Sequence, residues 1–261
     1  MDWIRYAVVF GAALIAGAVN SVAGGGTVFS FSGLVWFGLP TVNANATNAT
    51  ALIPGSVGGA LALYGELKAQ WRAFVALLVP TILGSLLGAF TVWQSAEAVF
   101  KAIVPFLVLL ATLIFASRDA ITQWVKQRQA ANASEQGVSR LGYVAGMALQ
   151  FLISFYGGYF GAGIGILMLT SLSVMGMTNL HKMNALKNIL AVAINGTAAI
   201  FFIQKGLVVW PVVVVAAVGA LVGGYGLGRY ARRIDQTALR KFVIAAGLVV
   251  TIYMFARLIL G

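Results

Sequence analysis

The chain of 261 residues contains no cysteine, one histidine and five prolines. Without cysteine it has no disulfide, no thiolate nucleophile and no cysteine-based metal site. The single histidine, with no HExxH pattern and no cysteine partner, disfavours an enzyme, and no catalytic residue, metal or cofactor is expected. The phosphate-binding pattern GxxxxGK[ST] is also absent, so direct use of ATP is not indicated.

Charge is scarce as well. Charged residues make up 9% of the chain and hydrophobic residues 61%, whereas charged residues are roughly 25% of a typical soluble domain. Most of the long apolar runs approach or exceed the roughly 20 residues that a helix needs to cross a bilayer. The first of them is not followed by a cleavage site and a soluble domain, so we expect it to be retained. The sequence therefore predicts an all-α polytopic membrane protein.

An internal repeat organises these runs. The stretch "SGLVWFGLPTVNANATNATALIPGSVGGALALY" begins at Ser32, and "TSLSVMGMTNLHKMNALKNILAVAINGTAAIFF" begins at Thr170, a spacing of 138 residues. A glycine cluster precedes each copy: "NSVAGGGT" from Asn20 and "GGYFGAGIG" from Gly157. Later spans carry glycines four apart, which suits close helix packing in lipid. Two copies of one unit are therefore expected to form one fold.

Each copy predicts a short, glycine-tipped helical hairpin followed by three transmembrane helices. Repeat one (1–117) comprises hairpin 5–39 and spans 43–64, 71–92 and 98–117; after a linker at 118–140, repeat two (141–261) comprises hairpin 141–177 and spans 181–203, 207–228 and 240–259. The second hairpin helix, at ~20 Å, is shorter than the ~30 Å hydrocarbon core. The hairpins either cross fully or are re-entrant. Both options return the chain to its starting side, so the second repeat is expected to be inverted.

The basic residues test this topology. One side receives Lys68, Arg72, Arg118, Lys126, Arg128, Arg140, Lys182, Arg229, Arg232, Arg233, Arg240 and Lys241, and the other only Arg5, Lys101, Lys205 and Arg257. By the positive-inside rule the first side is cytoplasmic. We therefore expect an inner-membrane protein with the 118–140 linker in the cytoplasm and both termini outside. The net charge of +11 is explained by these loops, and no nucleic-acid partner is expected.

Inverted halves with broken helices are typical of transporters whose solute site lies between the halves. Glycines allow tight turns, and the N–H groups and dipole of the helix that follows favour an anion. The candidate residues at the two tips are Asn20, Gly24, Gly25, Gly26 and Thr27, whose hydroxyl is expected to cap its helix, and Gly163 and Gly165. Under the alternative interpretation, the glycines only permit close helix packing.

Polar residues follow each hairpin on one helix face. They are Asn45, Asn48 and Thr50 in the first copy and Asn184, Lys187 and Asn188 in the second. Buried amides need partners, so both faces should point inward. Asn45 and Asn48 also match the N-glycosylation pattern, but the repeat places them on a helix. A lysine within an apolar span is a functional candidate, although Lys187 could instead extend to the cytoplasmic interface.

At these motifs the sequence resembles the sulfite exporter TauE/SafE family of bacterial membrane transporters, over nearly its whole length. The resemblance rests on the doubled glycine tips and on "NATNATALIPGSVGGALALY" and "MNALKNILAVAINGTAAIFF". Many members have a proline shortly after the tip, which "GGGTVFSF" and "GAGIGILML" lack. The resemblance implies export of a sulfur-containing anion, such as an organosulfonate or sulfite.

The sequence thus predicts a secondary transporter that moves its solute by alternating access. Its expected partners are a small anionic solute and the lipid bilayer. A homodimer is left open. A passive anion-selective channel would use the same selectivity chemistry without alternating access. An intramembrane enzyme and a structural membrane subunit are the remaining alternatives.

Overall fold

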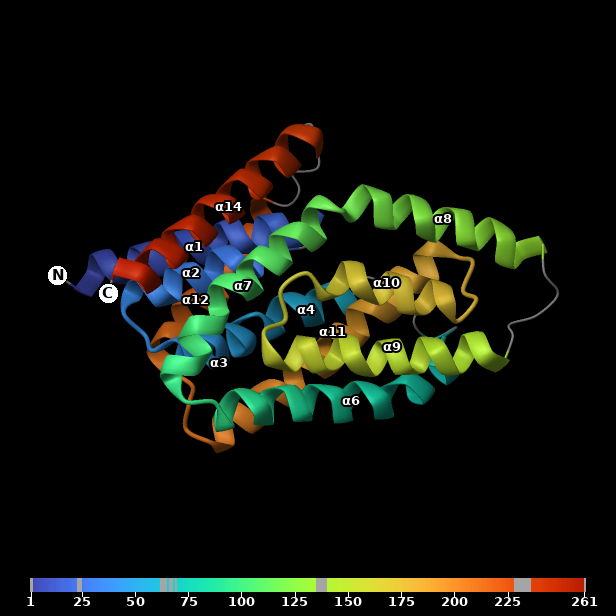
Figure 1. The fold of residues 1–261 in the computed structure, drawn as a ribbon, viewed down its shortest axis with the longest axis horizontal. Coiled ribbons are helices and arrows are strands. Elements are labelled where there is room, and N and C mark those ends of the chain that lie inside the picture. Colours follow the sequence, from blue (N-terminus) through green and yellow to red (C-terminus); the bar gives the residue numbers. More distant parts are fainter. Residues whose placement is uncertain are drawn as a thin grey trace.

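The computed structural model describes residues 2–22, 25–61, 65, 68, 70–134, 140–227 and 236–260, and within them all regular structure is helical (Figure 1). The helices are α1 (Asp2–Val22), α2 (Thr27–Phe37), α3 (Thr41–Ala51), α4 (Ile53–Leu61), α6 (Trp71–Gln94), α7 (Glu97–Ala116), α8 (Arg118–Ser134), α9 (Arg140–Tyr159), α10 (Ile164–Val174), α11 (Leu180–Gln204), α12 (Trp210–Val222), the π-helix η1 (Gly223–Leu227) and α14 (Gln236–Leu260). Among the described residues, six helices are long and apolar enough to cross a membrane. The all-α membrane fold is confirmed.

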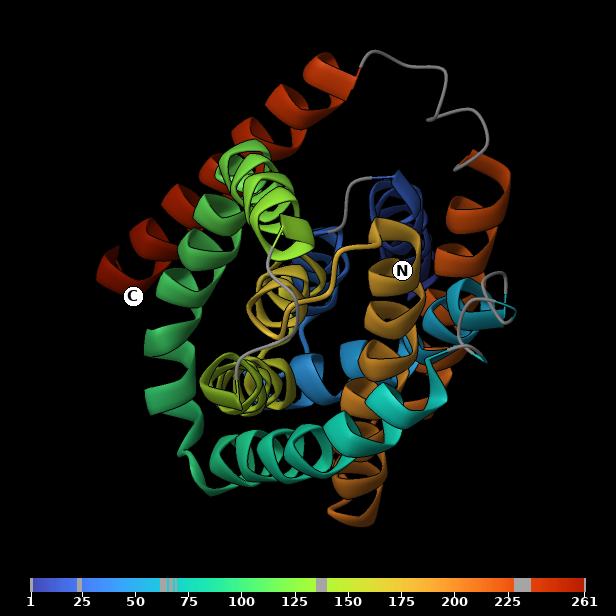
Figure 2. The ribbon, with the colours of Figure 1, turned by 90° about the vertical axis from the view of Figure 1, so that its right-hand side faces the viewer.

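The helices follow the order that the repeat predicts. A long helix and a short one (α1 and α2, then α9 and α10) open each copy, and α8 separates the copies. Helices α2 and α10 have 11 residues each, or about 16 Å, so neither could span a ~30 Å hydrocarbon core. In Figure 2 helices α6, α7, α12 and α14 lie around the outside, with α10 near the centre.

Equivalent helices of the two copies run in opposite directions where they can be compared. In Figure 1, α1 runs away from the end of the molecule that carries both termini, and α9 runs toward it. Helices α7 and α14 pack side by side and antiparallel. Phe106 meets Phe255 with ring centroids 4.9 Å apart, and Gly247 faces Thr112. These directions agree with an inverted repeat, and the inversion of the complete copies stays a prediction.

The two copies exchange helices. Helix α12 of the second copy packs along α1, and α6 of the first copy packs along α9. A Cβ atom placed on Gly223 would lie 1.9 Å from the carbonyl oxygen of Leu14, and one on Gly88 would lie 2.1 Å from that of Phe155. No side chain fits at either glycine, which accounts for the spacing of small residues seen in the sequence. We call α1, α2 and α12 unit one, and α9, α10 and α6 unit two.

Two apolar cores hold the helices together. The first joins α1, α2 and α12 to α3 and α7, with Phe31, Leu34 and Phe100 fully buried, and it also takes in residues of α6 and α11. The second joins α6, α9 and α10 to α11, with Met168 and Leu190 fully buried. The first core therefore bridges unit one and unit two.

A buried polar network stiffens unit two. Gln150 on α9 donates hydrogen bonds of 3.2 Å to Thr81 on α6 and to Ser154, and Ser171 on α10 donates one of 2.9 Å to Gln150. Ser85 on α6 donates to the carbonyl oxygen of Ile194 on α11 at 2.7 Å. Such bonds between helices stabilise packing in lipid, where the hydrophobic effect is weak.

Some predicted boundaries differ from the structure. The span expected at 43–64 is divided by a turn at Leu52 into α3 and α4, because Pro54 has no N–H for the helix ladder and its ring crowds the preceding turn. Residues 62–64 lie outside the described part. The span expected at 207–228 begins at Trp210 and ends in the π-helix η1. The linker expected at 118–140 contains α8, which is anchored by Val125, 1% exposed, in the second core.

Candidate anion site

The two glycine tips each contact the same turn of α7. Gly25 has φ +85° and Gly163 has φ +81°, values that glycine adopts without strain. A Cβ atom on Gly25 would lie 3.0 Å from Cδ2 of Phe115, and one on Gly163 would lie 3.3 Å from Cγ2 of Ile114. The fold therefore places two backbone turns that are far apart in the sequence against neighbouring residues of one helix.

The first tip is closed by its own residues. The backbone N–H of Gly26 donates to Oδ1 of Asn20 at 2.7 Å, and a Cβ atom on Gly26 would lie 2.1 Å from the carbonyl oxygen of Ala16. The expectation that Thr27 caps α2 is wrong: Gly26 is the N-cap, no side chain caps this helix, and Thr27 is already its first residue. Gly24 lies outside the described residues.

The second tip leaves its helix start uncapped. Gly163 is the N-cap of α10, and no side chain caps it. The Tyr156 hydroxyl donates to the carbonyl oxygen of Ala162 at 2.8 Å and so fixes the turn. The first N–H groups of a helix have no partner within the helix, and they form a ready site for an anion.

Lys187 lies against this second tip. Its Nζ donates to Oδ1 of Asn184 at 3.1 Å, and a Cβ atom on Gly165 would lie 3.5 Å from Cδ of Lys187. The lysine is therefore held along the first turn of α10. Asn188, one residue further on α11, is half-buried. The structure thus brings together Gly163, Gly165, Asn184 and Lys187, as the repeat alignment suggested.

The polar face of α3 divides into bonded and unbonded side chains. Asn45 donates to the carbonyl oxygen of Tyr159 at 2.9 Å, and Thr50 donates to the carbonyl oxygen of Ala46 at 2.8 Å. Asn48 is 2% exposed, and its Oδ1 has no hydrogen-bond partner in the described part of the chain. Asn45 and Thr50 therefore serve the fold, while Asn48 keeps one acceptor unused. An acceptor suits an N–H group or a cation on a solute, and not anionic oxygen.

Sequence reasoning missed the side chains that tie α3 to distant elements. Asn43 donates to the carbonyl oxygen of Leu207 at 2.9 Å, and Thr47 accepts from the N–H of Val209 at 3.2 Å. The Glu97 carboxylate accepts from the N–H groups of Thr41 and Val42 and so caps α3. Their partners are remote in the sequence, and no local pattern marks them.

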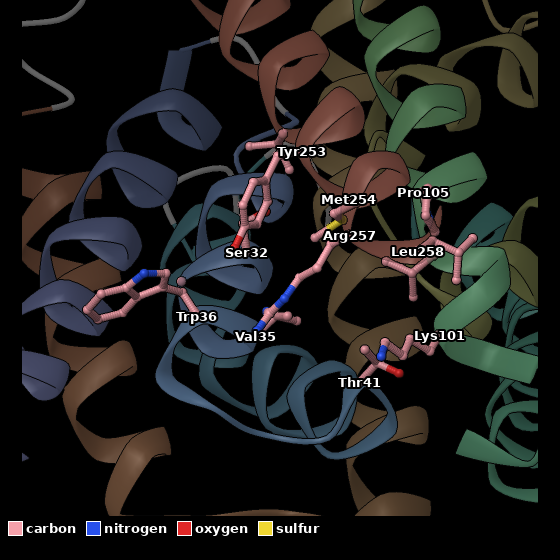
Figure 3. Close-up of a pocket in the computed structure, with 13 residues that line it drawn as sticks. Ser32, Val35, Trp36, Thr41, Lys101, Pro105, Tyr253, Met254, Arg257 and Leu258 are labelled. Atoms are coloured by element: carbon pink, nitrogen blue, oxygen red, sulfur yellow. The ribbon is translucent and has the colours of Figure 1, made fainter. Parts of the chain in front are cut away.

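A cleft of about 310 Å³ lies elsewhere, between α2, α7 and α14 (Figure 3). None of the predicted site residues lines it. The predicted anion site is therefore a packed junction in this structure, and the cleft is a separate feature.

Membrane-length helices with two glycine turns packed against one of them are typical of a polytopic membrane transporter, and comparison with known proteins agrees with that class. Residues 9–254 match the family described as "Sulfite exporter TauE/SafE". The chain belongs to this family, and the sequence-based resemblance is confirmed.

Several curated relatives carry transporter names. A "Probable membrane transporter protein" of Haemophilus influenzae is 25% identical over 250 residues, covering 95% of this chain and 93% of the relative. "Probable membrane transporter protein YfcA" of Escherichia coli (strain K12) is 25% identical over 252 residues, covering 97% and 88%. "Probable membrane transporter protein ORF9" of Sinorhizobium sp is 25% identical over 250 residues, covering 96% and 92%. No solved structure matches the chain significantly.

Proposed function

We propose that this membrane transporter is a secondary exporter of a small anion, an organosulfonate or sulfite, that works by alternating access. The observation that carries the proposal is the position of Lys187 along the uncapped first turn of α10, directly after the second glycine tip. A cation and a helix N-terminus at one point both favour negative charge. A charged group within a span is costly and is retained where it serves a function.

Within this site the residues have different roles. The Lys187 ammonium compensates the charge of the anion, Asn184 orients the ammonium, and the N–H groups after Gly163 bind anionic oxygens. The repeat alignment assigns Asn48 of α3 to the same site, and its unused acceptor favours a solute that also carries a donor. An aminosulfonate such as taurine would then bind more tightly than sulfoacetate.

The moving bodies in this proposal are the exchanged units. Backbone contacts at Gly223 and Gly88 lock α12 to α1 and α6 to α9, so the sequence repeats cannot rock apart as separate halves. Unit one and unit two tilt against one another, and the contacts that Ala89 and Val92 of α6 make in the first core rearrange as they do so. Alternating access of this kind opens the junction to one side at a time.

The binding site is tested by thermal stability of the purified protein in detergent, against sulfite, sulfate, thiosulfate, sulfoacetate, taurine and simple carboxylates. At least one sulfur anion should raise the melting temperature, and the rise should disappear in Lys187→Ala. Lys182→Ala is the matched control on the same helix. The hydrogen bond from Lys182 to Oδ1 of Asn179 is donated by its backbone N–H, so the substitution leaves this bond in place. A rise that persists unchanged in Lys187→Ala removes Lys187 from the site.

Transport is tested in proteoliposomes. An alternating-access transporter shows saturable exchange and counterflow of the anion identified above, whereas a passive channel shows neither. Anion flux without counterflow would instead support a passive channel.

The proposal places the chain in the inner membrane with α8 in the cytoplasm and both termini outside. Because the chain has no cysteine, single exposed cysteines can report sidedness without background. Gln127→Cys on α8 should be protected in intact cells from a membrane-impermeant maleimide, and Gln204→Cys, at the end of α11, should react. The reverse pattern would overturn the orientation.

A further inference from the structure

The cleft between α2, α7 and α14 has one charged region and one apolar region. Figure 3 shows the Arg257 guanidinium reaching across it toward Val35, and Lys101 beside Thr41. Val104, Pro105, Val250 and Met254 belong to its apolar lining. Its shape and chemistry therefore suit a molecule with an anionic head and a hydrocarbon tail.

The two cations of the cleft form no ion pair within the described part of the chain. No aspartate or glutamate is among the described residues that line the cleft. Glu97, one helical turn before Lys101, is the nearest acid along α7, and its carboxylate accepts hydrogen bonds from Thr41 and Val42 at the start of α3. Glu97 therefore offsets part of the Lys101 charge from outside the cleft, while Arg257 has no acid beside it among the lining residues. Two cations that face one cleft in this way favour an anion from outside the protein.

The cleft lies where lipid headgroups and acyl chains meet. Lys101 is close to the start of the Glu97–Ala116 span, and Arg257 is close to the end of the Lys241–Leu258 span. Trp36 and Tyr253 at the cleft are 53% and 54% exposed, and such aromatic residues are typical of the membrane interface. Further into the two spans, Phe106 on α7 and Val249 on α14 are also exposed, so these helices face hydrocarbon there.

We propose that this cleft binds one anionic phospholipid, such as phosphatidylglycerol. The phosphate lies between Lys101 and Arg257, and an acyl chain lies along Val104, Pro105 and Met254. Basic residues between transmembrane helices attract anionic headgroups, and in the proposed orientation this cleft opens to the outer leaflet of the inner membrane. The lipid fills the space between α14 and α2 and so fixes α14 to the rest of the molecule. The site is independent of the anion site at the glycine tips.

Lipid binding is measured by native mass spectrometry of the detergent-purified chain, titrated with phosphatidylglycerol or with phosphatidylcholine of the same acyl chains. The wild type should retain one phosphatidylglycerol in preference to phosphatidylcholine. The double variant Lys101→Gln/Arg257→Gln should bind it about thirtyfold more weakly. Arg5→Gln removes an exposed base that does not line the cleft, and it should bind like the wild type. Equal retention by the double variant, or equal retention of phosphatidylcholine, overturns the proposal.

A second variant separates the tail from the head. Val250→Trp fills the apolar part of the cleft and should reduce phosphatidylglycerol retention while leaving both cations in place. Inorganic phosphate distinguishes a lipid site from a free-anion site. Phosphate should not compete at equimolar concentration if the acyl chain contributes, and full competition by phosphate, with no effect of Val250→Trp, would contradict a lipid site. The anion-induced melting shift of the Lys187 site should be unchanged in all three variants.

Discussion

The two glycine tips share a backbone design but differ in chemistry. At the first tip α2 has no side-chain cap, and the N–H of Gly26 is taken by Asn20. At the second tip α10 also starts uncapped, and Lys187 lies along its first turn. The repeat spacing pairs Lys187 with Ala49. The duplicated unit thus supplies two turns against α7, and the residue that gives the second turn its lysine is an alanine in the first copy.

The helix that follows each tip also differs between the two copies. Helix α11 is continuous from Leu180 to Gln204, whereas its counterpart is divided at Leu52 into α3 and α4. Pro54 is paired by the repeat with Val192, so only the first copy has the residue that interrupts the ladder. The lysine is therefore carried by the rigid helix and the unpaired Asn48 by the broken one. A rigid support suits a charged group that must hold its position.

The largest contrast is expected from one alanine placed at each tip. In Gly26→Ala the new Cβ would collide with the Ala16 backbone, which should destabilise the protein by about 3 kcal/mol or more. In Gly165→Ala the Cβ makes an ordinary 3.5 Å contact with Lys187, which should cost less than about 1 kcal/mol. Melting temperature and monodisperse yield in detergent measure both. Equal losses would show that the tips are packed alike.

The next contrast concerns charge. Lys187→Ala should weaken anion binding about 10- to 100-fold, since a hydrogen bond to a charged group contributes about 1.5–3 kcal/mol. Adding Ala49→Lys to this variant moves the cation to the first tip. We expect no recovery in anion titrations, because Gly26 is already bonded to Asn20. Recovery would mean that the two tips are interchangeable.

A smaller contrast separates two neighbouring asparagines. Asn45→Leu removes the bond to the Tyr159 carbonyl and should lower stability by about 1–3 kcal/mol, because a buried acceptor loses its partner. Asn48→Leu removes an unpaired acceptor and should leave the melting temperature unchanged or higher, while the response to the solute falls. A clear loss of stability in Asn48→Leu would assign this residue to the fold.

The smallest effect is expected for Asn20→Ala. It removes one hydrogen bond at the first tip, which is worth about 1 kcal/mol, and water can reach the exposed site. Anion titrations should match those of the wild type. A large loss of affinity would place the first tip in the binding site on equal terms with the second.

Local sequence predicted most of the helices and the two glycine turns, and the repeat alignment suggested that Lys187 lies near the second turn. Periodic apolar runs and glycine clusters report directly on these features, and the repeat supplies the alignment between copies. The break before Pro54 follows from the same local rules, because a proline interrupts the hydrogen-bond ladder of a helix. The exchange of α6 and α12, the bond from Asn45 to Tyr159 and the cleft beside Arg257 depend on contacts between remote segments. No local pattern encodes which distant backbone will lie against a given glycine.

The exchange of helices also has a consequence for biosynthesis. When the ribosome delivers α9, its partner α6 is already in the membrane. Helix α1 must instead wait for α12, which is made near the end of synthesis, and meanwhile the groove at Gly17, later filled by the Ala220 backbone, can hold only lipid. Packing of the first hairpin is therefore completed only when α12 has been made. In a chain that stops before α12, helix α1 lacks the helix that packs against it.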